Sequence, residues 1–284
     1  MRLTLCASLL VVLLVAAGAT HPEPAAAARD CGKQGYAYAG LQSKRRAHGV
    51  RATITALARP FVESGHVAAW VGLGGPGQGP GGSDEWIQVG LAGLPGTGSR
   101  LYYEVAQPGQ APVYHELLND VQPGRRVRVA VLEMGQRPNH WRVWVDGEFV
   151  SEPIFLPRSG ARWRPIATAE TWDGGRRACN GYGYRFERLR VATWRGGSWV
   201  RFRSGHRWQD AGYRVVRPRR TTFRALATAV PVWQPGWWAE RLKSESQGAT
   251  ASPNAPSPAP PATEPAPAAP AEAAPAAFLP PLTG

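Results

Sequence analysis

The stretch that most constrains the fold spans residues 69–104, where every apolar run is short and is interrupted by glycine or proline. Its loop at residues 74–82 is too rich in glycine for a long helix, because each glycine costs a helix about 1 kcal/mol relative to alanine. Around this loop apolar and polar residues alternate with a period of two, which predicts strands at residues 71–73, 86–91 and 101–105.

Alternating runs continue through the length of one domain. They predict strands at residues 50–57, 127–131, 141–145, 166–172, 182–193, 199–202, 213–216 and 221–227. The dipeptide Asp146-Gly147 predicts a tight hairpin, and no stretch of useful length has the apolar stripe of an amphipathic helix. About ten strands joined by short turns are typical of an all-β fold, and we expect a concanavalin-like jelly-roll β-sandwich of two antiparallel sheets.

The two ends of the chain differ in composition from the region between them. Residues 1–28 have a short basic start and an apolar run, which predicts a secretory signal peptide cleaved after Ala19 or Ala28. That run is too short for a membrane span, so we expect none in the mature chain. Residues 244–284 are rich in alanine and proline, and we expect them to be disordered.

Residues 30–243 remain for the folded β-sandwich domain, which is long enough for one hydrophobic core. We expect this domain to be secreted and monomeric. Alanine- and proline-rich spacers are also typical of wall-associated exported proteins, so attachment to a cell wall is an alternative to free secretion.

The folded region is strongly basic. Residues 29–243 hold 32 Lys and Arg against 16 Asp and Glu, a formal net charge of +16. Such an excess either serves solubility or indicates an anionic partner such as a wall polymer. One candidate surface is the arginine-rich segment at residues 201–224, which also holds Trp208, Tyr213 and Phe223. No aromatic-interleaved basic motif is present, and we expect no specific nucleic-acid partner.

Two cysteines, Cys31 and Cys179, remain once the signal peptide with Cys6 is removed. In an exported protein an even pair predicts a disulfide, here one that ties the N-terminal end to a later loop. A reactive thiol is the alternative, although the sequence places no basic partner beside either cysteine.

Metal and cofactor motifs are missing from the sequence. The histidines have no paired zinc-site spacing, and we interpret them as surface or packing residues: His48, His66, His115, His140 and His206. The glycine-rich loop has neither the lysine nor the following helix of a phosphate-binding loop, and there is no Gly-x-Ser-x-Gly turn of a serine hydrolase. We therefore expect no metal site and no cofactor.

Three polar residues in apolar, strand-like runs are the best candidates for chemistry: Gln88, Glu104 and Glu170. A polar side chain between apolar neighbours on a strand either faces solvent or is hydrogen-bonded in a cleft. Tyr102 shares the strand face of Glu104, because the two residues are two positions apart. One strand thus offers an amide and the next a carboxylate.

Short motifs around these residues occur in a fixed order: Trp70-Val71-Gly72-Leu73-Gly74-Gly75, Ile87-Gln88-Val89-Gly90, Tyr103-Glu104 and Ala169-Glu170. Gln88 precedes Glu104 by 16 residues and Glu170 by 82. In order and spacing the motifs resemble those of the glutamic peptidases, also called eqolisins, and the resemblance covers residues 36–227.

The resemblance implies a two-sheet sandwich whose concave face carries a catalytic glutamine and glutamate. Glu170 would take a proton from the attacking water and later give it to the leaving amine, and Gln88 would donate an N–H to the developing oxyanion. Such a metal-independent endopeptidase acts on polypeptides and works best at acidic pH, near the pKa of a carboxyl group. Residues expected to contact the substrate are Trp70, Trp86, Tyr102, Glu104 and Trp172.

Three positions depart from the family pattern. Gly74 stands where the family has aspartate, Val105 replaces the tryptophan after Tyr-Glu, and Thr171 replaces the tryptophan after Ala-Glu, with Trp172 one position later. The alternative function is therefore a catalytically silent jelly-roll module that binds cell-wall polysaccharide, peptide or an anionic polymer.

Overall fold

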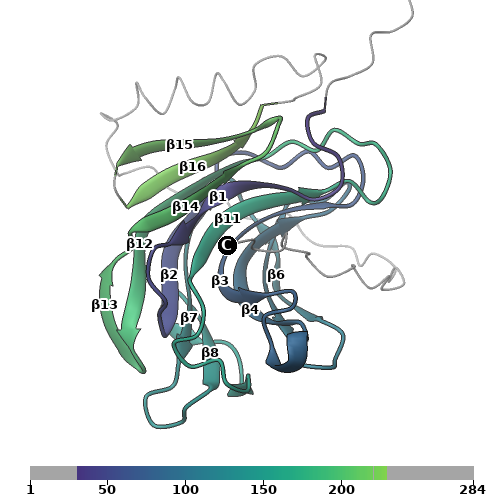
Figure 1. Cartoon of the computed structure of the whole chain (residues 1–284). Helices are drawn as coiled ribbons and strands as arrows, with labels where there is room; N and C mark the ends of the chain where they lie inside the picture. Colours follow the sequence, from purple (N-terminus) through teal and green to yellow (C-terminus); the bar gives the residue numbers. More distant parts are fainter. Residues whose placement is uncertain (1–30, 220, 229–284) are drawn as a thin grey trace, which may run out of the picture.

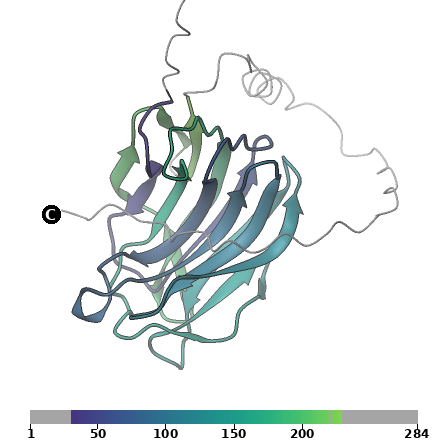
Figure 2. The same ribbon diagram turned by 90° about the vertical axis from the view of Figure 1, so that its right-hand side faces the viewer.

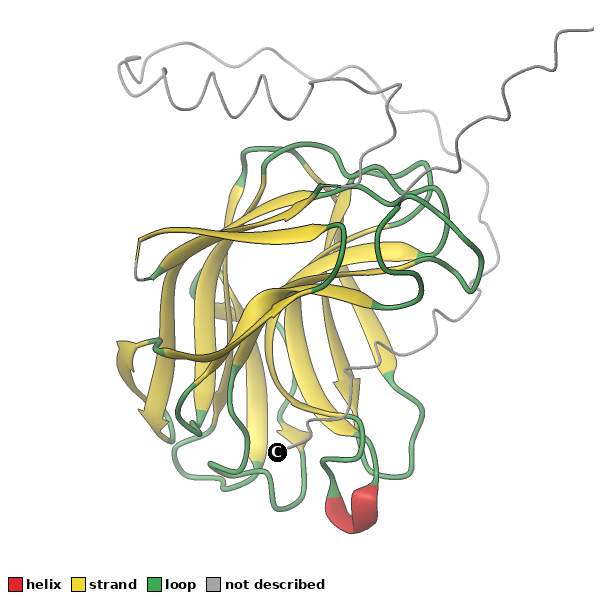
Figure 3. Cartoon of the chain, turned by 45° about the horizontal axis from the view of Figure 1, so that its top comes forward, coloured by secondary structure: helices red, strands yellow, loops and turns green. Residues whose placement is uncertain are grey.

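The computed structural model describes residues 31–219 and 221–228. Within this part of the chain there are sixteen β-strands and one short 3-10 helix, η1 (Pro80–Gly82), the red segment in Figure 3. No helix among these residues is long and apolar enough to cross a membrane. The expected signal peptide, the expected tail, and residues 30, 220 and 229–243 of the expected domain lie outside the described residues.

A seven-stranded antiparallel sheet forms one layer of the molecule (Figure 1). In spatial order its strands are β14 (Ser204–Gln209), β1 (Ala37–Ser43), β11 (Ile166–Trp172), β3 (His66–Gly75), β4 (Glu85–Gly93), β5 (Ser99–Ala106) and β6 (Val113–Val121). The three strands predicted around the glycine-rich loop, β3, β4 and β5, are consecutive neighbours in this sheet.

A nine-stranded antiparallel sheet forms the other layer. Its main path is β10 (Ile154–Phe155), β8 (His140–Val145), β7 (Arg126–Glu133), β2 (Gly49–Ala56), β12 (Gly183–Trp194), β16 (Thr222–Ala227) and β15 (Tyr213–Arg219). Two further strands extend it: β9 (Glu148–Phe149) pairs with β8, and β13 (Gly197–Arg201) pairs with β12.

The hydrophobic core lies between the two sheets, which overlap face to face in Figures 1 and 2. Residues at alternate positions of the central strands fill it, for example Ile54, Val71, Val89, Val129 and Phe186, all buried. Because successive strand residues point to opposite faces, the residues between them point away from the core. The two sheets confirm the expected all-β sandwich.

Strands β1, β6 and β14 are not predicted from the sequence. Strands β6 and β14 are the two edges of the seven-stranded sheet, and most of their residues are exposed or half-buried. Strand β1 has the opposite property, since all seven of its residues are buried. None of the three therefore shows the alternation of apolar and polar residues by which a half-buried strand is recognised.

Two local predictions are confirmed. Asp146 and Gly147 both adopt positive φ, 52° and 107°, in the turn between β8 and β9, as a two-residue hairpin of this type requires. Cys31 and Cys179 form a disulfide with a Cα–Cα distance of 4.8 Å. It joins residues 148 positions apart, and such a bond is typical of proteins in oxidising compartments.

The arginine-rich segment at residues 201–224 does not present the aromatic surface that its sequence suggests. Tyr213 and Phe223 belong to the hydrophobic core, where Phe223 stacks on Phe186 with ring centroids 4.4 Å apart. One arginine of the segment, Arg207, donates to the backbone oxygen of Val215. Tyr213 and Phe223 therefore provide no exposed aromatic ring between the arginines of this segment.

Candidate active site

The two candidate catalytic residues lie on the same outer face of the seven-stranded sheet. Gln88 is on β4 and Glu170 is on β11, with β3 between these strands. Gln88 pairs with Gly72 of β3, and Glu170 pairs with Ala68 of the same strand. Since Ala68 and Gly72 are an even number of positions apart, all four residues share one face, the one that points away from the core.

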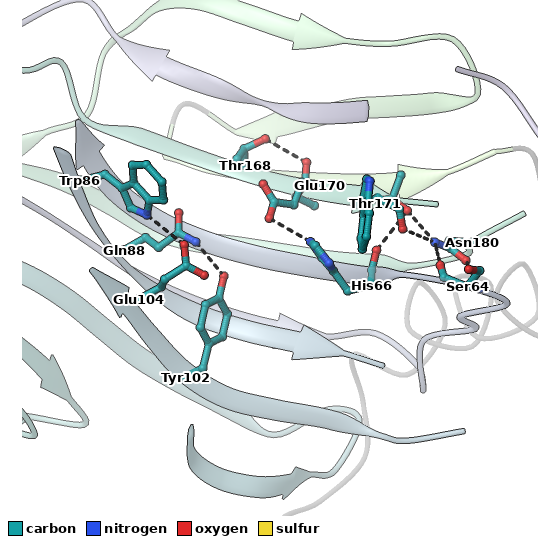
Figure 4. A network of polar contacts seen from close by, with 12 residues as sticks. Ser64, His66, Trp86, Gln88, Tyr102, Glu104, Thr168, Glu170, Thr171 and Asn180 are labelled. Carbon is teal, nitrogen blue, oxygen red and sulfur yellow. Dashed lines mark hydrogen bonds and ion pairs between the residues drawn. The ribbon is translucent and has the colours of Figure 1, made fainter. Parts of the chain in front are cut away.

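Gln88 belongs to a hydrogen-bonded group with β5 (Figure 4). Glu104 lies directly opposite Gln88 in the ladder. The Nε2 of Gln88 donates to the hydroxyl oxygen of Tyr102 at 3.2 Å, and the indole N–H of Trp86 donates to Glu104 Oε1 at 3.0 Å. These contacts hold the Gln88 amide and the Glu104 carboxyl group in place on the sheet face.

Glu170 is 1% exposed, and its two carboxyl oxygens differ in their contacts within the part of the chain that the structure describes. Its Oε1 lies 3.6 Å from Nε2 of His66, the first residue of β3, whereas Oε2 has no hydrogen-bond partner there. An unpaired buried carboxyl oxygen costs free energy, so it is a common feature of functional sites. Figure 4 shows this carboxyl group on the face that also carries Gln88.

His66 is held by aromatic rings. Trp172 is two positions after Glu170 on β11, and its ring centroid is 5.7 Å from that of His66. Tyr36 lies against both, with its ring centroid 5.9 Å from His66 and 6.0 Å from Trp172. From the sequence, His66 is interpreted as a surface or packing residue and is not placed beside Glu170. Its even spacing from Trp70 is the one signal that it shares this face.

Glu104, Tyr102 and Glu170 are close enough to affect one another's charge. Burial, and after it the negative charge of Glu170, raises the pKa of Glu104 to about 7, against the opposing effects of the Trp86 N–H and His66. Burial, and then Glu170 and Glu104, also raises the pKa of the Tyr102 hydroxyl well above its usual value. At acidic pH Glu104 is therefore neutral, and it adds no second negative charge beside Glu170.

The expected substrate-binding aromatics share the outer face, but they do not form an open groove. Trp70 packs with Tyr102, Ala68, Ala92 and Ile166 in a separate small cluster on this side of the sheet. Trp70, Trp86 and Tyr102 are each 3% exposed or less. Trp172, which contacts His66, is half-buried.

The three residues that depart from the resembled pattern each have a defined environment in the structure. Gly74 has φ +87°, and a Cβ atom there would lie 2.2 Å from the backbone oxygen of Glu85, so the aspartate of the family cannot be accommodated without a backbone shift. Val105 points into the main core. Thr171 accepts a hydrogen bond from Asn180, whose amide group also donates to the backbone oxygen of Ser64 just before β3.

Among the described residues, no group of three or more His, Cys, Asp or Glu side chains is arranged to hold a metal ion. The sequence matches no family model, and the search of curated proteins finds no match.

Solved structures of glutamic peptidases are similar to this chain. They include scytalido-glutamic peptidase with a peptide-based transition-state analogue (15% identity, TM-score 0.46) and the same peptidase with a transition-state analogue inhibitor (13%, 0.44). A third is SCP-B, a member of the eqolisin family of peptidases, in complex with the tripeptide Ala-Ile-His (14%, 0.42). Each match covers 68% of this chain and 98% of the other. The similarity in structure is thus accompanied by low sequence identity.

Proposed function

We propose that this protein is a secreted endopeptidase of the glutamic type, which hydrolyses polypeptides with Glu170 and Gln88 and without a metal ion. The observation that carries the proposal is the position of these two side chains on one face of one sheet, with Glu170 Oε2 unpartnered among the described residues. Its export is supported by the disulfide between Cys31 and Cys179.

In the first step Glu170 acts as the general base. Its carboxylate takes a proton from a water molecule, whose oxygen forms a bond to the carbonyl carbon of the peptide. The electron pair of the carbonyl moves to its oxygen, and the developing negative charge accepts a hydrogen bond from the Gln88 amide. Gln88 is suited to this role because the contact with Tyr102 uses only one of its two N–H bonds.

In the second step the proton on Glu170 moves to the nitrogen of the leaving amine. The carbon–nitrogen bond breaks, the carbonyl re-forms, and a carboxylic acid and an amine leave the site. Glu170 must be ionised at the start of each cycle and protonated in the middle of it, so we expect an acidic optimum. The raised pKa of Glu104 agrees with this, because Glu104 gains its negative charge only toward pH 7.

Aromatic side chains on the same face would shape the site on both sides of the bond that is cleaved, and the half-buried Trp172 would contact the polypeptide. Trp70, Trp86 and Tyr102 lie on the Gln88 side, and Trp172 lies beside His66. Glu104 would take part as a hydrogen-bond donor when it is protonated.

The test is a cleavage assay with a denatured protein as substrate, from pH 2 to pH 7, in which new N-termini are counted and the products are identified by mass spectrometry. Glu170→Gln should lower the rate by about 10²–10⁴-fold and Gln88→Ala by about 10²–10³-fold. Chelators and pepstatin should leave the parent rate unchanged.

Matched controls are Glu152→Gln and Gln110→Ala, which make the same kinds of change at exposed positions outside the site. Both should cleave as the parent does. The proposal fails if the parent does not cleave at any pH, or if cleavage survives undiminished in both site variants.

A second candidate function is a catalytically silent module that binds peptide or polysaccharide. The observation in its favour is burial, since Gln88 and Glu170 are only 4% and 1% exposed. A parent protein that binds a peptide, detected by a change in tryptophan fluorescence, but releases no new N-termini would support this candidate over the peptidase.

A further inference from the structure

A groove of about 770 Å³ lies on the outer face of the nine-stranded sheet. Five arginines line it, and no acidic side chain is among its lining residues: Arg51, Arg128, Arg188, Arg190 and Arg201. The sandwich places this surface on the side opposite the Gln88 face, because each sheet turns its other face toward the shared core. The groove is therefore a separate surface from the candidate active site.

Three of these arginines form a row across neighbouring strands. Arg51 of β2 pairs directly with Arg190 of β12, and Arg190 pairs directly with Arg201 of β13. Strands in a sheet are about 4.8 Å apart, and like charges directly opposite each other destabilise a ladder. The fold thus aligns three positive charges that the sequence keeps far apart, and it does so at a cost in stability.

The chain itself neutralises little of this charge. Arg128 pairs with Asp146, with Nε and Oδ1 3.4 Å apart. Arg188 and Arg201, in contrast, make no ion pair or hydrogen bond through their side chains with any described residue. Burial, and then the positive charge of Arg190, lowers the pKa of Arg51. An anion bound here would relieve this repulsion.

A bulge in β12 adds a further arginine to the groove. The pairing of β12 with β2 shifts register between Glu187 and Arg190, and Arg188 in between has φ +54°. Bulges of this kind redirect side chains, and a positive φ at a residue other than glycine costs free energy. The nearby carboxylate of Glu187 points to other arginines, since it lies 3.3 Å from Arg126 and 3.6 Å from Arg185.

A tryptophan stands at the other end of the arginine row. Ala130 of β7 pairs with Arg51 on one side and with Trp144 of β8 on the other. The Nε1 of Trp144 is buried and has no acceptor among the described residues. Arginine and tryptophan side chains donate hydrogen bonds and accept none, so the row fits a ligand with many acceptor oxygens.

We propose that this arginine groove binds a linear anionic polysaccharide, whose carboxylate or sulfate groups pair with the row of Arg51, Arg190 and Arg201. Single-stranded nucleic acid fits less well, because its bases stack on successive free aromatic rings. Here the Arg51 guanidinium lies over the ring of Trp199, 4.5 Å from its centroid, and Trp144 packs edge-on against Phe149. The groove therefore offers charge rather than a stacking ladder.

The proposal can be tested on the exported chain by titration with heparin, a sulfated glycan, and polygalacturonate, a carboxylated one, with neutral dextran as the uncharged reference. We expect at least one anionic glycan to bind, dextran not to bind, and affinity to fall as salt is added. Arg190→Gln combined with Arg201→Gln should weaken binding at least about tenfold, because two charge-assisted contacts are lost.

The control is Arg45→Gln combined with Arg214→Gln, which removes the same charge from exposed positions outside the groove. It should leave the affinity within about twofold of the parent, as remote surface charges do. Equal weakening by both double variants, or no binding of either anionic glycan, would overturn the proposal. Tighter binding of single-stranded DNA than of both glycans, lost in the groove variant, would assign the groove to nucleic acid instead.

Discussion

The outer faces of the two sheets carry opposite chemistry. On the seven-stranded sheet Glu170 and Gln88 are buried among aromatic rings, whereas on the nine-stranded sheet Arg190 and Arg201 are exposed. Burying polar groups is costly and exposing arginines is not. The face of the seven-stranded sheet is therefore recognised by buried polar groups at positions where an apolar residue would be more stable. The face of the nine-stranded sheet is recognised only by the strand register, which aligns like charges.

The largest expected effect separates the two faces by activity. Glu170→Gln should lower cleavage by about 10²–10⁴-fold and leave glycan affinity unchanged. Arg190→Gln combined with Arg201→Gln should weaken glycan binding and leave the cleavage rate unchanged. The two measurements are the rate of new N-terminus release and the glycan titration. If either variant impaired both properties, the comparison between two independent faces would fail.

The second prediction concerns the tight backbone next to the candidate site. Gly74→Ala should lower the free energy of unfolding by about 2–4 kcal/mol, because φ is +87° and the added Cβ would lie 2.2 Å from the Glu85 backbone oxygen. Gly77→Ala is the matched control, with φ +69° and an added Cβ that would lie 3.9 Å from the Gly82 backbone oxygen. It should cost about 1 kcal/mol. Equal losses in urea unfolding would show that the close contact is not important.

The sequence predicts part of the fold and part of the candidate site. Apolar alternation predicts the central strands, and Gln88, Glu104 and Glu170 are predicted on strands that the structure places in one sheet. Edge strands β6 and β14 lack that alternation, so they are not predicted. The arginine row is invisible in the sequence, because residues 51, 190 and 201 meet only through the pairing of β2, β12 and β13.

The third prediction concerns a carboxyl group that neither outer face uses. Glu85 is fully buried, neither of its oxygens has a hydrogen-bond partner within the described residues, and burial raises its pKa to about 7 despite Arg162. When the pKa of a carboxyl group is higher in the folded state than in the unfolded state, the free energy of unfolding decreases as the pH rises from the unfolded pKa to the folded pKa. For Glu85 this range runs from about 4.5 to 7.

Glu85→Gln should therefore remove about 1–3 kcal/mol of the decrease in stability between pH 4 and pH 8. Urea unfolding at both pH values measures this. Glu148→Gln, at an exposed position with no ion pair to a described residue, is the control and should leave the pH dependence as it is in the parent. An unchanged pH dependence in Glu85→Gln would mean that this carboxyl group is ionised or solvated in the fold.

The smallest effect concerns His66, which we place as a positioning residue for Glu170. His66→Gln should lower kcat about tenfold and leave KM unchanged, because the carboxyl group loses its neighbour 3.6 Å away while the substrate contacts remain. His206→Gln, an exposed position, is the control. A change in KM alone would assign His66 to substrate binding instead.

The central claim is that Gln88 and Glu170 act on one peptide bond together, and a double-mutant cycle tests it most directly. The measurement is kcat/KM for the parent, Gln88→Ala, Glu170→Gln and the double variant at the optimal pH. Residues that act as a unit are strongly non-additive, so the double variant should be no slower than Glu170→Gln alone. Losses that multiply, or single variants as fast as the parent, would contradict a shared catalytic site.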